Sequence, residues 1–296
     1  MLLFQRQQKQ HLVGASAHRE ILSKLGGYPS AQQLSREVYR FYGDSLSFIE
    51  SSDFSCTAFA LNLQHEPIAL KSAEIKLQLG TGRVAEALAH ELLHLRLPML
   101  GFPLGESVWI PLQLDHYVAN FLGMSQWVLN LVQHEINFQS FIELGFDKKH
   151  FLSKPVKPIN YRKRFSRRPQ NGPVEEIDFP RWCIAYLGHL FTARHGGNED
   201  SMGYAQEALD WGSRLHAELK RISDAINNWF ALGAFKDPCQ YPRQVNRLLE
   251  LMRIPQYTGW VILEFSEAQK PVAVRLEDIG VCYDGLDVTF SALPFY

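Results

Sequence analysis

The sequence lacks the features that mark secreted and membrane proteins. It has only four cysteines among 296 residues, and no two of them form a CxxC pair, so neither a disulfide framework nor a cysteine-rich metal site is expected. No run approaches the roughly 18 uncharged apolar residues that a membrane-spanning helix needs. The apolar residues 1–4 turn polar at Gln5 and are too few for the core of a secretory signal. We therefore expect a cytoplasmic protein with no membrane partner.

An excess of charge of one sign is also absent. The 30 Lys and Arg residues stand against 31 Asp and Glu residues and leave a formal net charge of −1. No overall field would therefore attract nucleic acid or acidic lipid. Hydrophobic residues make up 46% and charged residues 21% of the chain, which is close to the usage of ordinary globular proteins. A chain of this size can bury a core without disulfides or metal.

The order of hydrophobic patterns predicts an α+β fold. Helical patterns fill most of residues 1–45, strand-like runs follow between 46 and 79, and an apolar helix is expected over 83–97. Further helices are expected at 111–122, 125–144, 178–194, 202–232 and 244–252. Short strands are expected at 260–265, 272–276 and 288–293, with Asp284 and Gly285 in a hairpin turn.

A change of composition divides the chain. Residues 154–168 carry seven basic residues and no acidic one, and turn-forming residues follow at 169–173. We interpret 153–176 as a basic linker or loop between a metal-binding domain, 1–152, and a helical region, 177–296, that ends in a β-hairpin. Tyr161 and Phe165 within the basic segment make a nucleic-acid patch conceivable. A solvated loop is favoured because acidic residues follow immediately.

The motif His90-Glu91-Leu92-Leu93-His94 lies in the apolar helix predicted over 83–97. Residues four apart lie on one face of a helix, so both imidazoles can bind one metal ion. Glu91 lies about 100° around the helix from His90, where its carboxylate can accept a proton from a water bound to that ion. Because the surrounding residues predict a buried helix, three polar groups there need a shared partner.

This motif resembles the HExxH signature of the zincin metallopeptidases. The resemblance implies Zn²⁺ as the cofactor, His90 and His94 as zinc ligands and Glu91 as the general base. It also implies a zincin-like N-terminal domain with a small sheet whose edge strand binds an extended peptide, for which residues 70–79 are the candidate. The residues after His94 depart from the metzincin pattern. The gluzincin pattern, with a glutamate from a later helix as third ligand, stays open.

The third ligand can be sought by helical angles. Between residues 127 and 142, the average direction of the apolar side chains lies within about 20° of Glu135. His134 lies roughly 85° from that direction. A carboxylate inside an apolar stripe needs a cation, so Glu135 is favoured as the third ligand. His134, Asp115, His116 and Glu106 stay as alternatives, and so does a salt bridge from Glu135 to a core-facing Arg or Lys.

Groups around the ion are less well defined. Asp115 is a candidate acceptor for the outer N–H of a histidine ligand, and His116 and Tyr117 are candidates to stabilise an oxyanion. The other histidines are isolated in sequence and are expected at the surface or as satisfied core residues. They are His65, His150, His189, His195 and His216.

The sequence therefore predicts a zinc metallopeptidase that hydrolyses a peptide bond in a peptide or protein substrate. One alternative is a non-catalytic interaction or regulatory protein with a structural zincin-like core. The other is a metal-dependent hydrolase acting on nucleic acid, supported only by the basic segment. The sequence specifies no oligomeric state.

Overall fold

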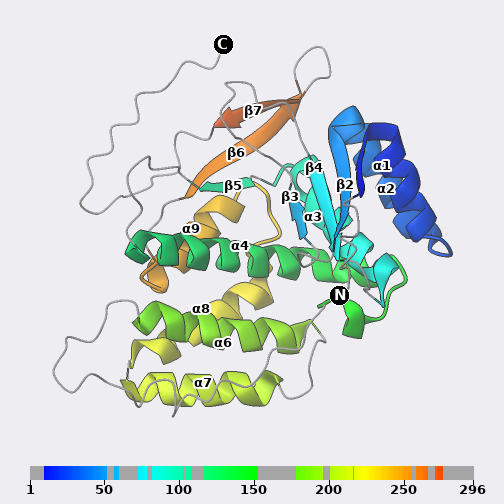
Figure 1. Cartoon of the computed structure of the whole chain (residues 1–296). Coiled ribbons are helices and arrows are strands. Elements are labelled where there is room, and N and C mark those ends of the chain that lie inside the picture. The colour runs from blue at the N-terminus through cyan, green and yellow to red at the C-terminus, as the bar shows by residue number, and fades with distance from the viewer. Residues whose placement is uncertain are drawn as a thin grey trace, which may run out of the picture.

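The computed structural model describes residues 10–51, 57–59, 73–78, 82–102, 104–107, 116–152, 178–195, 201–215, 217–254, 258–265 and 271–275 (Figure 1). Within these residues the chain is α+β and mostly helical, which confirms the expected fold class. None of the described helices combines the length and the apolar character needed to cross a bilayer.

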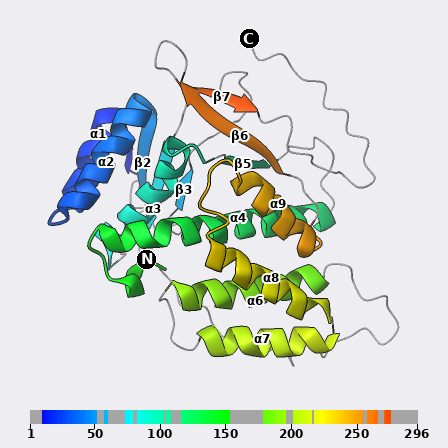
Figure 2. The same ribbon diagram turned by 180° about the vertical axis from the view of Figure 1, so that it is seen from behind.

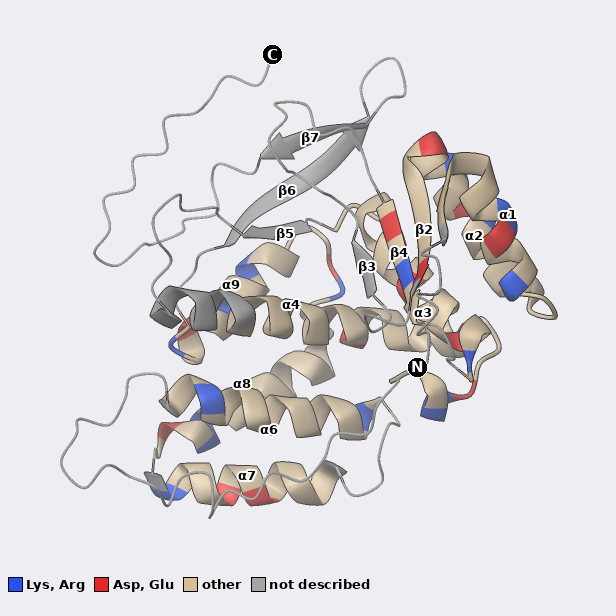
Figure 3. Cartoon of the chain, in the orientation of Figure 1, with Lys and Arg blue, Asp and Glu red and all other residues tan. Residues whose placement is uncertain are grey.

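The first sheet contains β1 (Gln10–Val13), β2 (Leu46–Ser51), β3 (Thr57–Phe59) and β4 (Ala73–Gln78), in the order β1-β2-β4-β3. β2 and β4 are parallel, and the two outer pairings are antiparallel. Side chains alternate across a strand, so β4 buries Ala73, Ile75 and Leu77. Glu74 and Lys76 lie on its other face and form an ion pair of 2.8 Å, where Figure 3 shows both signs of charge on β4.

Two helices precede most of this sheet in sequence. α1 (Gly14–Lys24) contacts β2, and α2 (Pro29–Tyr42) contacts α3. Pro29 occupies the first turn of α2, where its missing N–H costs nothing. The helix ends at Gly43, whose φ of +58° favours glycine. The strand β1 was not expected, because residues 1–45 carry a mainly helical pattern.

The motif helix α3 (Val84–Met99) matches the prediction over 83–97 and runs two residues further. It packs against β3, β4, α1, α2 and α4. Leu88, Leu92 and Leu95 are completely buried. Elements therefore surround α3 on several sides, as its apolar composition predicted.

The helix α4 (His116–Glu143) is one continuous helix of 28 residues, whereas the sequence predicted a break between residues 122 and 125. Gly123 costs only about 1 kcal/mol inside a helix, which packing against several neighbours can offset. α4 contacts α3, α6, α9 and β5 (Leu104–Ser107). Figures 1 and 2 both show it between the strands and the layer formed by α6 and α7.

Four helices follow: α6 (Asp178–Arg194), α7 (Ser201–Leu215), α8 (Glu218–Leu232) and α9 (Tyr241–Leu251). The bounds of α6 are those predicted. The single helix predicted over 202–232 is wrong, because the chain turns back between α7 and α8. Gly212 of α7 lies close to Leu219 of α8, because a β-carbon on Gly212 would meet the end of the Leu219 side chain.

A second sheet is formed by β5, β6 (Thr258–Phe265) and β7 (Pro271–Arg275), in the order β5-β6-β7 with antiparallel pairing. β5 lies in the connection after α3, where no strand was predicted. The strand expected over 288–293 and the turn at Asp284 and Gly285 lie outside the described residues, as does the basic segment 153–176.

The buried side chains form two cores that share α4. The N-terminal core is made by α1, α2, α3, β2 and β4 with Phe141, Phe146 and Phe151. The C-terminal core is made by the earlier part of α4 and by α6 to α9 with Leu97 and Phe102. Val128 and Val132 of α4 belong to the C-terminal core, and Phe141 belongs to the N-terminal core. α4 therefore passes from one core to the other along its length.

Candidate metal centre

Three histidines from two helices converge where the two cores meet. His90 and His94 lie on α3 and His134 lies on α4. One ring nitrogen from each lies within 4.8 Å of the other two. Nε2 of His90 is 3.1 Å from Nε2 of His94. Two imidazole nitrogens on a tetrahedral Zn²⁺ lie about 3.3 Å apart, given bonds of about 2.0–2.1 Å, so this spacing suits a shared ion.

The local sequence of α4 explains why His134 reaches α3. His134, Phe138 and Phe141 have the i, i+4, i+7 spacing of one helical face. Phe141 belongs to the N-terminal core and Phe138 packs against it, so this face is turned toward α3. The ring centroid of Phe151 lies 4.8 Å from the ring centroid of His90 and 5.4 Å from that of His134. Aromatic side chains therefore line the histidine group.

Burial keeps the three imidazoles neutral. It lowers the pKa of His94 to about 4, against the opposing hydrogen bond with Gln133. Burial also holds the pKa of His90 and of His134 well below the ordinary value, and the neighbouring histidines lower both further. A metal ion binds only the unprotonated ring, so all three offer lone pairs at neutral pH. His90 and His94 are half-buried and His134 is buried.

Gln133 orients His94. Nδ1–H of His94 donates to Oε1 of Gln133 over 2.9 Å, and the lone pair is then on Nε2, the nitrogen that faces His90. Such an outer hydrogen bond fixes the tautomer and the ring orientation of a metal ligand. Sequence reasoning missed Gln133, and its position directly before a candidate ligand was the only signal for it.

Glu91 is buried at 7% exposure on α3. It follows His90 directly, and a step of one residue turns the side chain by about 100° around the helix. Its carboxylate therefore belongs to the same region of α3 as the two imidazoles without sharing their face. The role of Glu91 as a base beside a metal ion stays a prediction.

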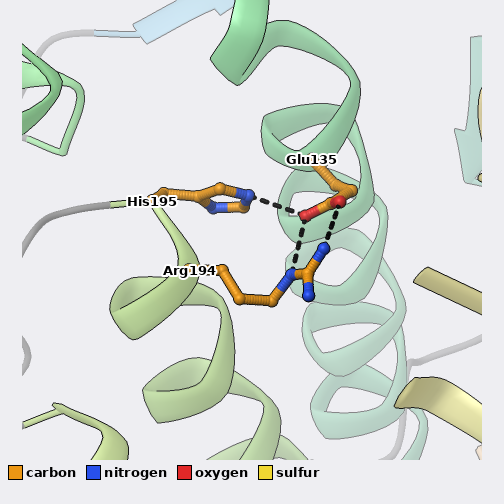
Figure 4. Close-up of polar contacts among 3 residues, drawn as sticks. All are labelled: Glu135, Arg194 and His195. Atoms are coloured by element: carbon orange, nitrogen blue, oxygen red, sulfur yellow. Dashed lines mark hydrogen bonds and ion pairs between the residues drawn. The ribbon is translucent and has the colours of Figure 1, made fainter. Parts of the chain in front are cut away.

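Glu135, the favoured third ligand, is not part of the histidine group. Its carboxylate instead accepts hydrogen bonds from Arg194 Nη2 at 2.8 Å and from His195 Nε2 at 2.8 Å (Figure 4). The group within reach of one ion contains His134, which the sequence had left as an alternative. Averaging the apolar directions of α4 was misleading because its two parts face different cores.

The side chains of the other candidates lie outside the part of the chain that the structure describes, so their place in the group stays a prediction. Asp115 lies outside the described residues. Glu106 lies in β5, and His116 and Tyr117 lie in the first turn of α4, but their side chains are not among those described. His65 and His216 also lie outside.

The isolated histidines differ from expectation in two cases. His150 Nδ1 pairs with Glu86 Oε1 at 3.2 Å, in keeping with a satisfied residue. His195 is 1% exposed and bonded to Glu135 rather than isolated. His189 is completely buried, and neither ring nitrogen has a hydrogen-bond partner among the described residues. Sequence spacing gave no signal for either buried ring.

The prediction that residues 70–79 form an edge strand for substrate binding is wrong. Residues 70–79 contain β4, which lies between β2 and β3 rather than at an edge. Its backbone pairs with β2 from Ala73 to Gln78 and with β3 over Glu74 to Lys76. A peptide cannot add to a strand that is already paired on both sides. β1 and β3 are the outer strands of this sheet.

Comparisons of the chain with models of protein families, with curated proteins and with solved structures find no match. The functional argument therefore depends on the geometry of the histidine group.

Proposed function

We propose that this protein is a zinc-dependent hydrolase that cleaves peptide bonds. His90, His94 and His134 would hold the ion, and Glu91 would act as the general base. The convergence of the three ring nitrogens within 4.8 Å carries the proposal, together with the buried carboxylate next to His90.

The donor set fits Zn²⁺. Imidazole nitrogen is a common zinc ligand, and three histidines with one remaining position form a known type of catalytic zinc site. Structural zinc sites are instead closed by four protein ligands. Among the residues that the structure describes, the group has three members, which is the number of protein ligands in a catalytic zinc site.

The chemistry divides between the ion and Glu91. A bound Zn²⁺ would lower the pKa of a coordinated water to about 7 and polarise the carbonyl under attack. Glu91 would accept the proton of the attacking water and then donate it to the leaving amine. The peptide substrate is inferred from the resemblance of the motif to zincins.

The test compares two glutamates of α3. We expect Glu91→Gln to keep bound zinc but to lose at least a hundredfold in the hydrolysis of a mixture of internally quenched peptides, because the amide cannot accept the proton. Glu86→Gln is the matched control, since Glu86 lies on the same helix and pairs with His150. Zinc content is measured by elemental analysis of each purified protein.

Hydrolysis by Glu91→Gln at the rate of Glu86→Gln, with equal zinc content, would remove Glu91 from the mechanism. Purified protein that binds zinc tightly but hydrolyses none of the peptides would overturn the peptidase assignment. That second outcome would favour the regulatory alternative with a structural core.

A further inference from the structure

A second polar cluster lies beside the histidine group and has no role in the mechanism above. Glu135 of α4 accepts hydrogen bonds from Nε and Nη2 of Arg194, at 3.3 and 2.8 Å, and from Nε2 of His195, at 2.8 Å (Figure 4). Burial raises the pKa of Glu135, but the bonds from His195 and Arg194 outweigh it and lower the pKa overall. Glu135 is therefore a carboxylate bound from two sides by the end of α6.

The cluster is anchored in the helical region. The guanidinium of Arg194 lies 4.3 Å from the ring centroid of Phe230 in α8. Arg194 therefore contacts α4 and α8 at the same time, and a planar guanidinium that binds in this way has few other positions available. The Glu135 carboxylate is thus tied to elements of the C-terminal core.

The imidazole of His195 is packed among aromatic rings. Its ring centroid is 4.9 Å from that of Phe138, 5.7 Å from that of Phe151 and 5.6 Å from that of Phe191. Its Nδ1 is buried with no hydrogen-bond partner among the described residues. Because a buried nitrogen without a partner costs free energy, the hydrogen bond from Nε2 to Glu135 is the polar contact that offsets the burial of this ring.

The cluster is adjacent to the metal centre. Glu135 is the next residue after His134, so the atoms that fix Glu135 also fix the helical turn that carries His134. Phe151 contacts His195, His90 and His134. Phe151 therefore connects His195 of the cluster to two of the three histidines of the metal site.

We propose that Glu135, Arg194 and His195 form a positioning cluster for the metal centre, in which α6 holds the turn of α4 that presents His134 to His90 and His94. This inference rests on the metal-binding part of the proposed function and not on the hydrolytic step. None of the three residues touches the ion; they act through His134.

The experiment measures metal binding without hydrolysis. Zn²⁺ affinity is determined by competition with a chelator, and the visible spectrum of the Co²⁺-substituted protein reports the ligand geometry. We expect Glu135→Gln and Arg194→Gln to weaken Zn²⁺ binding at least tenfold and to shift the Co²⁺ bands, as loss of an outer partner typically weakens binding 10- to 100-fold. Arg194→Lys keeps the charge and should recover part of the affinity.

The matched control is Glu218→Gln. Glu218 of α8 also pairs with an arginine, Arg253, but the pair is exposed. We expect this variant to bind Zn²⁺ and Co²⁺ as the unchanged protein does.

His195→Phe separates positioning from stability. This change removes the hydrogen bond to Glu135, and a positioning role predicts that Zn²⁺ binding by the folded protein weakens by more than the loss of stability seen in urea unfolding of the metal-free protein accounts for. The inference is overturned if Glu135→Gln, Arg194→Gln and His195→Phe all bind Zn²⁺ like Glu218→Gln, or if affinity falls only in proportion to the unfolded fraction. Either result would leave the Glu91 test of hydrolysis unaffected.

Discussion

The two cores of this protein contribute to the histidine group in different ways. The N-terminal core surrounds α3 and includes Phe141 of α4, and the three histidine donors lie on these two helices. The α6 side, which belongs to the C-terminal core, contributes no histidine of the group. Its residues Arg194 and His195 instead donate hydrogen bonds to Glu135, the residue next to His134. Tyr241 of α9 also faces Gln133, and burial raises the pKa of its hydroxyl. Direct ligands and their supports therefore come from different parts of the fold.

The largest expected effect comes from comparing His134, a proposed metal ligand, with its neighbour Glu135, which we propose holds His134 in place. His134→Ala removes a donor of the histidine group, and we expect purified protein to retain less than a tenth of the zinc of the unchanged chain and no hydrolysis of quenched peptides. Glu135→Ala should retain measurable zinc with weakened affinity. Elemental analysis after dialysis against buffer decides between them. Equal zinc loss in the two variants would contradict the different roles that we assign to His134 and Glu135.

Two buried aromatic residues, one in each core, test this comparison through the free energy of unfolding. Phe141 and Trp182 are each at most 1% exposed, in the N-terminal and C-terminal core respectively. We expect replacement of either by Ala to lower the free energy of unfolding by about 3–5 kcal/mol, as measured by urea titration. Phe141 also contacts Phe151, which lines the histidine group. Only Phe141→Ala should therefore weaken zinc binding in the folded protein.

Acid should destabilise the metal-free protein through the N-terminal core. The folded-state pKa of His90, His94 and His134 is lowered by burial, so the unfolded chain takes up protons first as pH falls below about 6.5. Stability is present above that pH and is lost as pH falls toward the folded-state pKa, which is about 4 for His94.

Each of these imidazoles contributes a slope of up to about 1.4 kcal/mol per pH unit. We expect urea titrations at pH 7, 6 and 5 to show this loss, and His134→Asn to have a shallower dependence on pH. A metal-free protein equally stable at pH 7 and pH 5 would contradict the neutral, buried state of these rings.

The smallest effect concerns the outer partner of His94. Gln133→Leu keeps the size of the side chain but removes the acceptor of the His94 N–H, so we expect zinc affinity to fall about tenfold. Gln133→Glu keeps an acceptor oxygen and should retain the affinity. Gln126→Leu, two turns earlier on α4, serves as the control. Chelator competition measures all three.

The predictable part of the site lies within one helix. His90, Glu91 and His94 follow from spacing along α3, since a helix fixes the relative directions of residues one and four apart. The α+β class and the bounds of α6 likewise follow from local patterns. These signals depend on neighbours in sequence and need no knowledge of the rest of the fold.

The third donor could not be obtained in that way. At about 100° per residue, His134 lies about 20° from Phe141 and about 40° from Phe138, whereas the average direction of the apolar residues between positions 127 and 132 lies roughly 110° from His134. One average over the whole helix mixed the two directions and selected Glu135. Knowing which core each part of α4 contacts requires the tertiary structure. The partners Arg194 and His195 are 59 and 60 residues from Glu135, so no local pattern could identify them.

Three consecutive residues of α4 each make a different set of contacts. Gln133 binds His94, His134 completes the histidine group, and Glu135 binds α6. Rotating the helix about its axis by a single residue would break all of these contacts together. Insertion or deletion of one residue between α4 positions 128 and 133 should therefore be far more damaging than a change of length in the turn after Glu143, because the helix has only one acceptable rotational setting.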